Sequence, residues 1–262
     1  MKLRTTLRER RRQVIYLVPN LFTTGNLFCG LYAIFAVFSA NYMKAAVAIL
    51  VALIFDMLDG SAARWTKTTS RFGVEYDSLA DLVSFGVAPG VLIYAWALSG
   101  YGFLAEAVVF AFVGCGALRL ARYNVMTGTV DNRYFQGLPI PAAASILATL
   151  VLMDHHILRL GLEVTPPVTL GVVFALAFLM VSTIKYTKFK GMKLVAGEGF
   201  MYLVWALLII MLVAAAPQIA LLVLFAGYAL SGIVMMVVGW ARRGLRKGAP
   251  AERASGEAKD TE

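Results

Sequence analysis

Long runs of apolar residues alternate with short polar segments along the chain. Each run can cross about 30 Å of hydrocarbon, because an α-helix rises about 1.5 Å per residue. The pattern predicts eight membrane-spanning helices, over residues 20–40, 42–63, 74–98, 102–125, 138–157, 166–184, 200–215 and 217–240. Since a backbone in lipid must satisfy its hydrogen bonds internally, the expected fold class is an all-α polytopic membrane helical bundle.

Composition and charge support this interpretation. Of the 262 residues, 60% are hydrophobic, well above the usual ~45–50% of soluble domains. The net charge of +9 does not indicate a nucleic-acid-binding protein, because of where the basic residues lie. With both termini cytoplasmic and eight alternating spans, 22 of the 24 Lys and Arg residues are cytoplasmic, and only Lys44 and Arg159 are outside. This asymmetry is the positive-inside rule, and it predicts the orientation.

Four aspartates interrupt the second and third apolar runs. Asp56 and Asp59 are three residues apart, and Asp77 and Asp81 are four apart, so each pair lies on one helix face. Counted from the polar loop at 66–71, the two pairs lie at matching depths on an antiparallel pair of helices. We therefore predict that four carboxylates converge in one pocket near the inner membrane surface.

Four like charges in such a pocket would repel one another unless a cation neutralised them. An all-oxygen ligand set favours Mg²⁺ or Mn²⁺, and no His or Cys lies nearby to favour zinc. The alternative is a divalent-cation carrier, which would need polar groups continuing to the outer face. The outer halves of the spans are almost wholly apolar, and this favours a one-sided pocket.

Small residues and one arginine flank these aspartates. Gly60, Ala63 and Gly73 remove side-chain bulk, so a ligand or a partner helix can approach the backbone closely. Arg64 carries a guanidinium whose forked donors suit phosphate. A metal ion beside an arginine indicates a phosphate-bearing lipid substrate.

Together, residues 56–81 read D-x2-D-G-x2-A-R-x8-G-x3-D-x3-D. This pattern resembles the signature of the CDP-alcohol phosphatidyltransferase family at all eight fixed positions. Members of the family transfer a phosphatidyl group from a CDP-linked lipid to an alcohol and release CMP. The resemblance implies a six-helix membrane core with two metal ions between spans two and three.

The resemblance also implies a role for each fixed residue. Asp56, Asp59 and Asp77 would be metal ligands, and Asp81 would be the general base as well as a contact to the metal. The implied CDP site contains Gly60, Ala63, Arg64 and Gly73. An attacking hydroxyl does need a base within hydrogen-bond reach, but the spacing alone does not choose between Asp77 and Asp81 for that role.

Four flanking stretches are similar to the branch of the family that uses serine and makes phosphatidylserine. They are Leu17–Gly30, Asp77–Gly90, Cys115–Val125 and Gly137–Ala144. The expected substrates are therefore CDP-diacylglycerol and L-serine. The alternative acceptors are glycerol 3-phosphate, inositol and inositol phosphate.

A serine site needs a receptor for the carboxylate. Arg119 and Arg122, one helix turn apart, are suitable, with Asn124 as a weaker partner. Anchoring at the inner membrane surface is the alternative role for both arginines. On the first span, Asn20, Thr23 and Asn26 recur every three residues and are expected to line the CDP site; otherwise they cap the helix after Pro19 or bond between helices.

The expected organisation has four parts. These are a basic interfacial segment at 1–19, the six-helix catalytic core at 20–184, a loop with two accessory spans at 185–241, and a basic disordered tail at 242–262. We assign no chemistry to the accessory spans, which would add packing or an oligomer face, as in a homodimer. The expected location is a prokaryotic plasma membrane.

Overall fold

The computed structural model describes residues 2–66, 70–126, 134–154, 165–187 and 216–247, with positions 201, 204, 207 and 211 between the last two ranges. Its helical elements are α1 (Lys2–Phe38), α2 (Tyr42–Thr66), α3 (Arg71–Asp81), η1 (Leu82–Val87), α4 (Ala88–Ile93), η2 (Tyr94–Leu98), η3 (Ser99–Tyr101), α5 (Gly102–Met126), α6 (Ile140–Met153), α7 (Thr165–Val181) and α9 (Pro217–Lys247). Two short strands, β1 (Tyr134–Gln136) and β2 (Lys185–Thr187), complete the described elements.

The predicted all-α polytopic bundle is confirmed. Four helical stretches are long and apolar enough to cross a membrane: Pro19–Phe38, Tyr42–Ala62, Arg71–Met126 and Pro217–Met236. Arg71–Met126 supplies two spans, because α5 packs back against η1 and α4. Helix α5 begins at Gly102, whose φ of 52° suits glycine. Helices α6 and α7 are shorter apolar helices. The predicted seventh span at 200–215 lies almost wholly outside the described residues.

The first helix does not end at Pro19, where the sequence predicts a boundary between interfacial segment and span. Helix α1 runs through it from Lys2 to Phe38. Proline removes one backbone donor, but its carbonyl remains an acceptor. The Pro19 carbonyl lies 3.2 Å from the Thr23 hydroxyl, which has a closer acceptor on α2 at 2.9 Å. At the other end of the chain, α9 continues to Lys247, into the segment expected to be a disordered tail.

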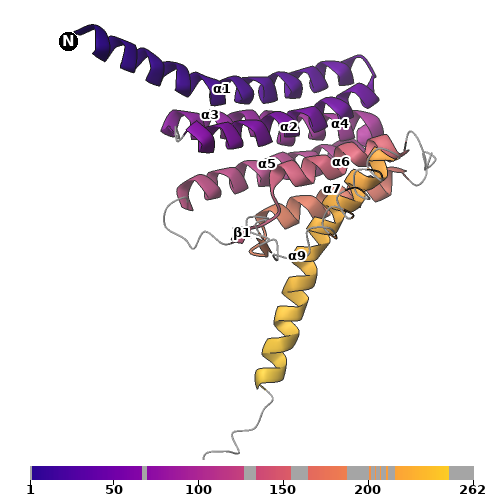
Figure 1. Cartoon of the computed structure of the whole chain (residues 1–262). Coiled ribbons are helices and arrows are strands. Elements are labelled where there is room, and N and C mark those ends of the chain that lie inside the picture. Colours follow the sequence, from indigo (N-terminus) through magenta and orange to yellow (C-terminus); the bar gives the residue numbers. More distant parts are fainter. Residues whose placement is uncertain are drawn as a thin grey trace, which may run out of the picture.

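Helices α1 and α2 pack along each other (Figure 1); α3 lies against α1, and η1 and α4 lie against both. Helix α5 packs on α7, and α6 packs between α2 and α9. The buried core is rich in alanine, so the helices approach closely. Figure 1 shows α2 ending at the same end of the bundle as α5, where α3 begins.

The third span is not a uniform α-helix. A π-helical turn, η1, follows Asp81 directly, and a second one, η2, ends the span. Ser84 within η1 packs against Gly30 of α1, where a Cβ would lie 2.7 Å from the Ser84 Cα. Such π-helical turns occur mostly as local insertions and are frequent at functional sites.

An antiparallel pair of three-residue strands joins the segment before α6 to the segment after α7. The sequence pattern does not predict these strands, because each is too short to show an alternation. Gly137, with φ of 76°, follows β1, and its N–H donates to the Ile184 carbonyl at 2.9 Å. We call β1, β2 and this bond the β1–β2 pair.

Candidate active site

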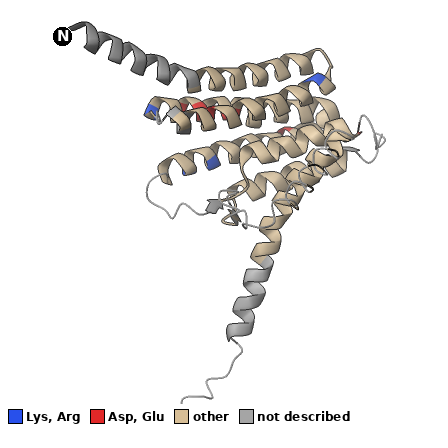
Figure 2. Ribbon diagram, viewed as in Figure 1, with Lys and Arg blue, Asp and Glu red and all other residues tan. Residues whose placement is uncertain are grey.

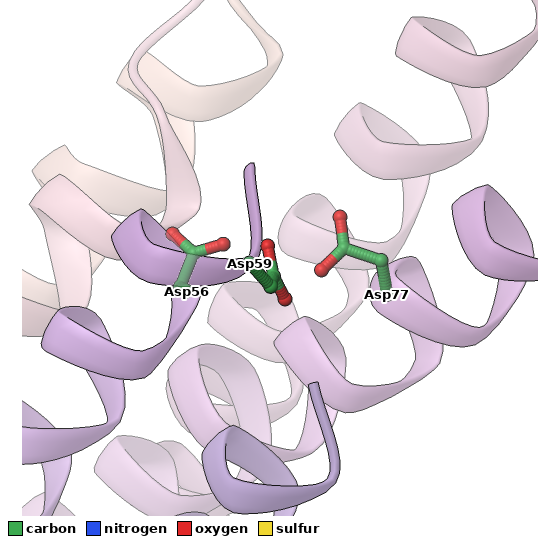
Figure 3. Close-up of side chains that lie close together, drawn as sticks. All are labelled: Asp56, Asp59 and Asp77. Carbon is green, nitrogen blue, oxygen red and sulfur yellow. The ribbon is translucent and has the colours of Figure 1, made fainter. Parts of the chain in front are cut away.

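Three of the four predicted carboxylates meet between α2 and α3. Figure 2 shows acidic residues gathered where these two helices lie side by side. Oxygens of Asp56, Asp59 and Asp77 all lie within 4.8 Å of one another (Figure 3). Asp59 is buried, and Asp56 and Asp77 are half-buried. The antiparallel register predicted from the sequence therefore produces a real cluster.

The chemistry of this cluster fits a divalent cation. Ionised carboxylates whose oxygens lie within 4.8 Å of one another repel strongly unless a proton or a cation lies between them. The Asp77 Oδ1 atom is buried and has no hydrogen-bond partner. Three oxygen donors with an unpartnered lone pair match Mg²⁺ or Mn²⁺. These three residues can hold a metal ion.

Thr23 of α1 supports the cluster from the side. It is only 3% exposed, and its hydroxyl donates to Asp59 Oδ2 at 2.9 Å. A hydrogen bond from a neighbouring side chain fixes the orientation of a metal-binding carboxylate and tunes its affinity. The sequence predicts Thr23 in the CDP site, and the structure places its hydroxyl against the Asp59 carboxylate.

Asp81 lies one turn deeper on α3, outside the group of three. It is 7% exposed, and its Oδ1 accepts a hydrogen bond from Asn26 Nδ2 at 2.9 Å. Asn26 is fully buried, and its backbone carbonyl accepts from the Ser84 hydroxyl at 2.9 Å. Because Ser84 fits against Gly30, the π-helical turn η1, Asn26 and Asp81 form one connected unit. Asp81 is close enough to the other three aspartates to interact with them electrostatically.

Arg119 of α5 is a buried cation that interacts with these carboxylates. Its side chain is 7% exposed, and it interacts electrostatically with Asp81 and Asp56. Its Nε is buried and has no hydrogen-bond partner. A buried, unpaired guanidinium donor is costly, so this atom is suited to an anionic ligand.

The structure separates the other two predicted serine-binding residues from Arg119. The Arg122 guanidinium donates to four backbone carbonyls, of Gln136, Met180, Val181 and Ser182, at 3.1–3.5 Å. Asn124 lies between α5 and α3, where its amide donates to Glu75 and Ser78 at 3.3 and 3.0 Å. Both side chains therefore bond within the protein.

The remaining predicted residues lie around the open end of the cluster. Gly60 has open space where a Cβ would stand, so a ligand can reach the backbone there. At Gly73 a Cβ would lie 3.6 Å from Asn20 Oδ1, which brings α1 and α3 together at this point. The side chains of Ala63 and Arg64 lie outside the described residues.

Three buried polar atoms of the described residues lack a partner, and all belong to this site. They are Asn26 Oδ1, Asp77 Oδ1 and Arg119 Nε. An unpaired buried polar atom costs about 1–3 kcal/mol, so native proteins rarely keep several together without a ligand. The set offers two acceptors and one donor around Asp81. It can bind a molecule that carries both an anionic group and hydrogen-bond donors.

Sequence reasoning missed Ser84 and its contact with Gly30. The available signal was a hydroxyl residue inside an apolar span, one turn after a carboxylate. Such a residue is expected to bond to its own helix, as Ser145 does to Pro141. Only the packing of η1 on α1 shows that Ser84 bonds across helices instead.

Comparisons with known proteins identify the family suggested by the sequence pattern. The family model of CDP-alcohol phosphatidyltransferase matches residues 16–182. A CDP-diacylglycerol–serine O-phosphatidyltransferase of Helicobacter pylori strain J99 is 40% identical over 225 residues, covering 85% of this chain and 92% of that protein. The Bacillus subtilis protein of the same name is 37% identical over 174 residues, 66% of this chain and 91% of its own. An archaetidylserine synthase of Methanothermobacter thermautotrophicus is 35% identical over 177 residues, 67% and 71% of the two chains.

Proposed function

Since this chain belongs to the CDP-alcohol phosphatidyltransferase family, we propose that it transfers a phosphatidyl group from CDP-diacylglycerol to the hydroxyl of L-serine. The products are phosphatidylserine and CMP. The observation that carries this proposal is the cluster of Asp56, Asp59 and Asp77, together with Asp81 and the buried Arg119, whose Nε atom has no hydrogen-bond partner. The names of the similar proteins support serine as the acceptor.

The carboxylate cluster is the site for the CDP diphosphate. Asp56, Asp59 and Asp77 would hold two divalent cations, Mg²⁺ or Mn²⁺, with Asp81 at the edge of the set. When bound, such ions supply charge neutralisation on the diphosphate and on the departing CMP. Gly60 leaves room for the nucleotide to approach the backbone of α2. Ala63, Arg64, Gly73 and Asn20 complete the CDP site in this proposal.

Asp81 is the general base. The hydrogen bond from Asn26 fixes one of its oxygens and leaves the other for the serine hydroxyl. The base accepts the hydroxyl proton as the serine oxygen attacks the phosphorus next to diacylglycerol. The bond from this phosphorus to the CMP oxygen breaks, and CMP leaves with the electron pair.

Arg119 binds the serine carboxylate. Its buried guanidinium lies within electrostatic range of Asp81, so an acceptor held by Arg119 can place its hydroxyl on the base. We infer that Arg122 supports the β1–β2 pair and the end of α7 and does not bind serine, because its guanidinium already donates to carbonyl oxygens there. Asn124 joins α3 to α5 and so supports the wall of the site.

The site would open to the cytoplasm. The ends of α2 and α5 and the start of α3 lie at one end of the bundle (Figure 1), and the sequence places many of its basic residues in and beside these segments. The two hydrocarbon chains of CDP-diacylglycerol would remain in the lipid while the diphosphate reaches the carboxylates. The cell would use the enzyme in its plasma membrane to make an anionic phospholipid.

A comparison of two acceptors tests the role of Arg119. Serinol has the hydroxyl and amine of serine but no carboxylate. Arg119→Ala should raise the serine KM about 10- to 100-fold, the value of a charge-assisted contact of about 1.5–3 kcal/mol, and should change the serinol KM little. Arg119→Lys should restore little of the serine affinity, because an ammonium lacks the paired N–H donors of the guanidinium. An equal rise for both acceptors would assign Arg119 to the diphosphate or to the fold, and the carboxylate receptor would have to be another residue.

A further inference from the structure

Two hydrogen bonds join the third span to a single residue of α1. Asn26 Nδ2 donates to Asp81 Oδ1 at 2.9 Å, and the Ser84 hydroxyl donates to the backbone carbonyl of Asn26, also at 2.9 Å. Asp81 is the last residue of α3, and Ser84 lies three residues later in the π-helical turn η1. The side chain and the backbone of Asn26 are therefore bonded to neighbouring positions of the same span.

The packing around these two bonds leaves little room for movement. Asn26 and Ser84 are fully buried, and Asp81 is 7% exposed. A Cβ on Gly30, one turn after Asn26, would lie 2.7 Å from the Ser84 Cα, which is too close for two carbon atoms. Glycine at position 30 therefore lets the backbone of η1 approach α1 closely enough for the Ser84 hydroxyl to reach Asn26.

The bond made by Ser84 differs from the one that a serine within a helix usually makes. Ser78, Ser145 and Ser231 each donate to a carbonyl three or four residues earlier in their own helices. Ser84 instead bonds across to α1, at the residue that carries the donor for Asp81. The bond also lies in a π-helical turn, a feature that is frequent at functional sites.

We propose that Ser84 is a positioning residue for the general base Asp81, and that it acts through Asn26. The Ser84 bond holds the backbone of Asn26 against η1. The amide of Asn26 then holds Asp81 Oδ1, and the second oxygen of Asp81 stays where it can accept the proton of the acceptor hydroxyl. This inference rests on the proposed function, in which Asp81 is the base. It gives a role in the reaction to a residue outside the signature at 56–81.

This role affects the rate of the reaction and not the binding of substrates. Proton transfer needs the base within hydrogen-bond reach of the hydroxyl, and small errors in the position of a reacting group lower the rate. Loss of the Ser84 bond should therefore lower kcat and leave the KM values for serine and CDP-diacylglycerol unchanged. The fall in kcat should be equal for serine and serinol, because both present a hydroxyl to the same base.

The test is a double-mutant cycle in the full-length enzyme. Ser84→Ala removes one oxygen and keeps the rest of the side chain, and Asn26→Ala removes the amide that bonds to Asp81. Ser145→Ala is the matched control, because Ser145 is equally buried but donates to a carbonyl of its own helix at 2.7 Å. Ser84→Ala and Ser145→Ala are each made alone and together with Asn26→Ala. kcat and KM are measured with serine and with serinol, and thermal unfolding midpoints are recorded.

We expect Ser84→Ala to lower kcat about 3- to 10-fold, the range for one neutral hydrogen bond. Asn26→Ala should lower kcat about 10- to 100-fold, since its bond is to a carboxylate. In protein that already carries Asn26→Ala, Ser84→Ala should lower kcat no further, because the amide through which Ser84 acts is absent. Ser145→Ala should leave kcat unchanged in both backgrounds.

The cycle separates positioning from general support of the fold. A loss of correctly folded protein would lower kcat by the same factor with and without Asn26→Ala, and this result would overturn the inference. An unchanged kcat in Ser84→Ala, or a fall with serine but not with serinol, would also overturn it. Wild-type protein that transfers the phosphatidyl group to a different alcohol would refute the proposed function alone, and the same cycle with that alcohol would still decide the role of Ser84.

Discussion

Thr23→Val tests whether α1 supports the metal-binding carboxylates. The substitution keeps the shape of the side chain and removes one hydroxyl, which donates to Asp59 Oδ2 at 2.9 Å in a position only 3% exposed. A hydrogen bond to an ionised group contributes about 1.5–3 kcal/mol, so its loss corresponds to about 10- to 100-fold. Loss of a similar supporting contact costs metal sites about 10- to 100-fold in affinity or activity.

The assay is activity as a function of Mg²⁺ or Mn²⁺ concentration at saturating CDP-diacylglycerol and serine. We expect the metal concentration for half-maximal activity to rise about 10- to 100-fold, with kcat recovered at high metal. Thr149→Val is the matched control, since this buried hydroxyl bonds only to carbonyls of its own helix. An unchanged metal requirement with a raised KM for CDP-diacylglycerol would refute the reasoning and assign Thr23 to the nucleotide, as the sequence alone predicts.

Three further predictions address the cluster, the packing and the topology. Asp59→Asn should keep less than about a tenth of wild-type activity at saturating metal, a change of ~1.4 kcal/mol in the barrier; greater activity would remove Asp59 from the ligand set. Gly30→Ala should lower the free energy of unfolding by about 1–3 kcal/mol in denaturant titrations, because a Cβ there overlaps Ser84, whereas Gly171→Ala has open space and should not. In a protein lacking its native cysteines, Ser70→Cys should react with an impermeant thiol reagent only from the cytoplasm and Ser99→Cys only from outside; the reverse would invert the topology.

The carboxylate cluster could be predicted from the sequence because helix geometry determines it. The spacings of Asp56, Asp59 and Asp77 and the short loop between α2 and α3 are sufficient to bring their side chains together. The same regularity predicts the spans, since the length of an apolar run must match the thickness of the membrane. The family signature then adds the chemistry.

Contacts between helices distant in the sequence could not be predicted in this way. Arg119 and Arg122 have the same residue type and lie one turn apart, yet one faces the carboxylates and the other binds carbonyls. The different partners of the two arginines depend on where the β1–β2 pair lies, and each of its strands has only three residues. The π-helical turn after Asp81 depends likewise on packing of Ser84 against Gly30, which no periodicity reveals.

Product formation by the purified protein tests the central claim most directly. The protein is incubated with CDP-diacylglycerol and Mg²⁺ or Mn²⁺, with L-serine, glycerol 3-phosphate, inositol or no acceptor, and both CMP and the lipid product are quantified. The proposal predicts equal amounts of CMP and phosphatidylserine with serine alone, and no product after the metal is removed with EDTA. Transfer to another alcohol in preference to serine, or transfer that continues without a divalent cation, would contradict it.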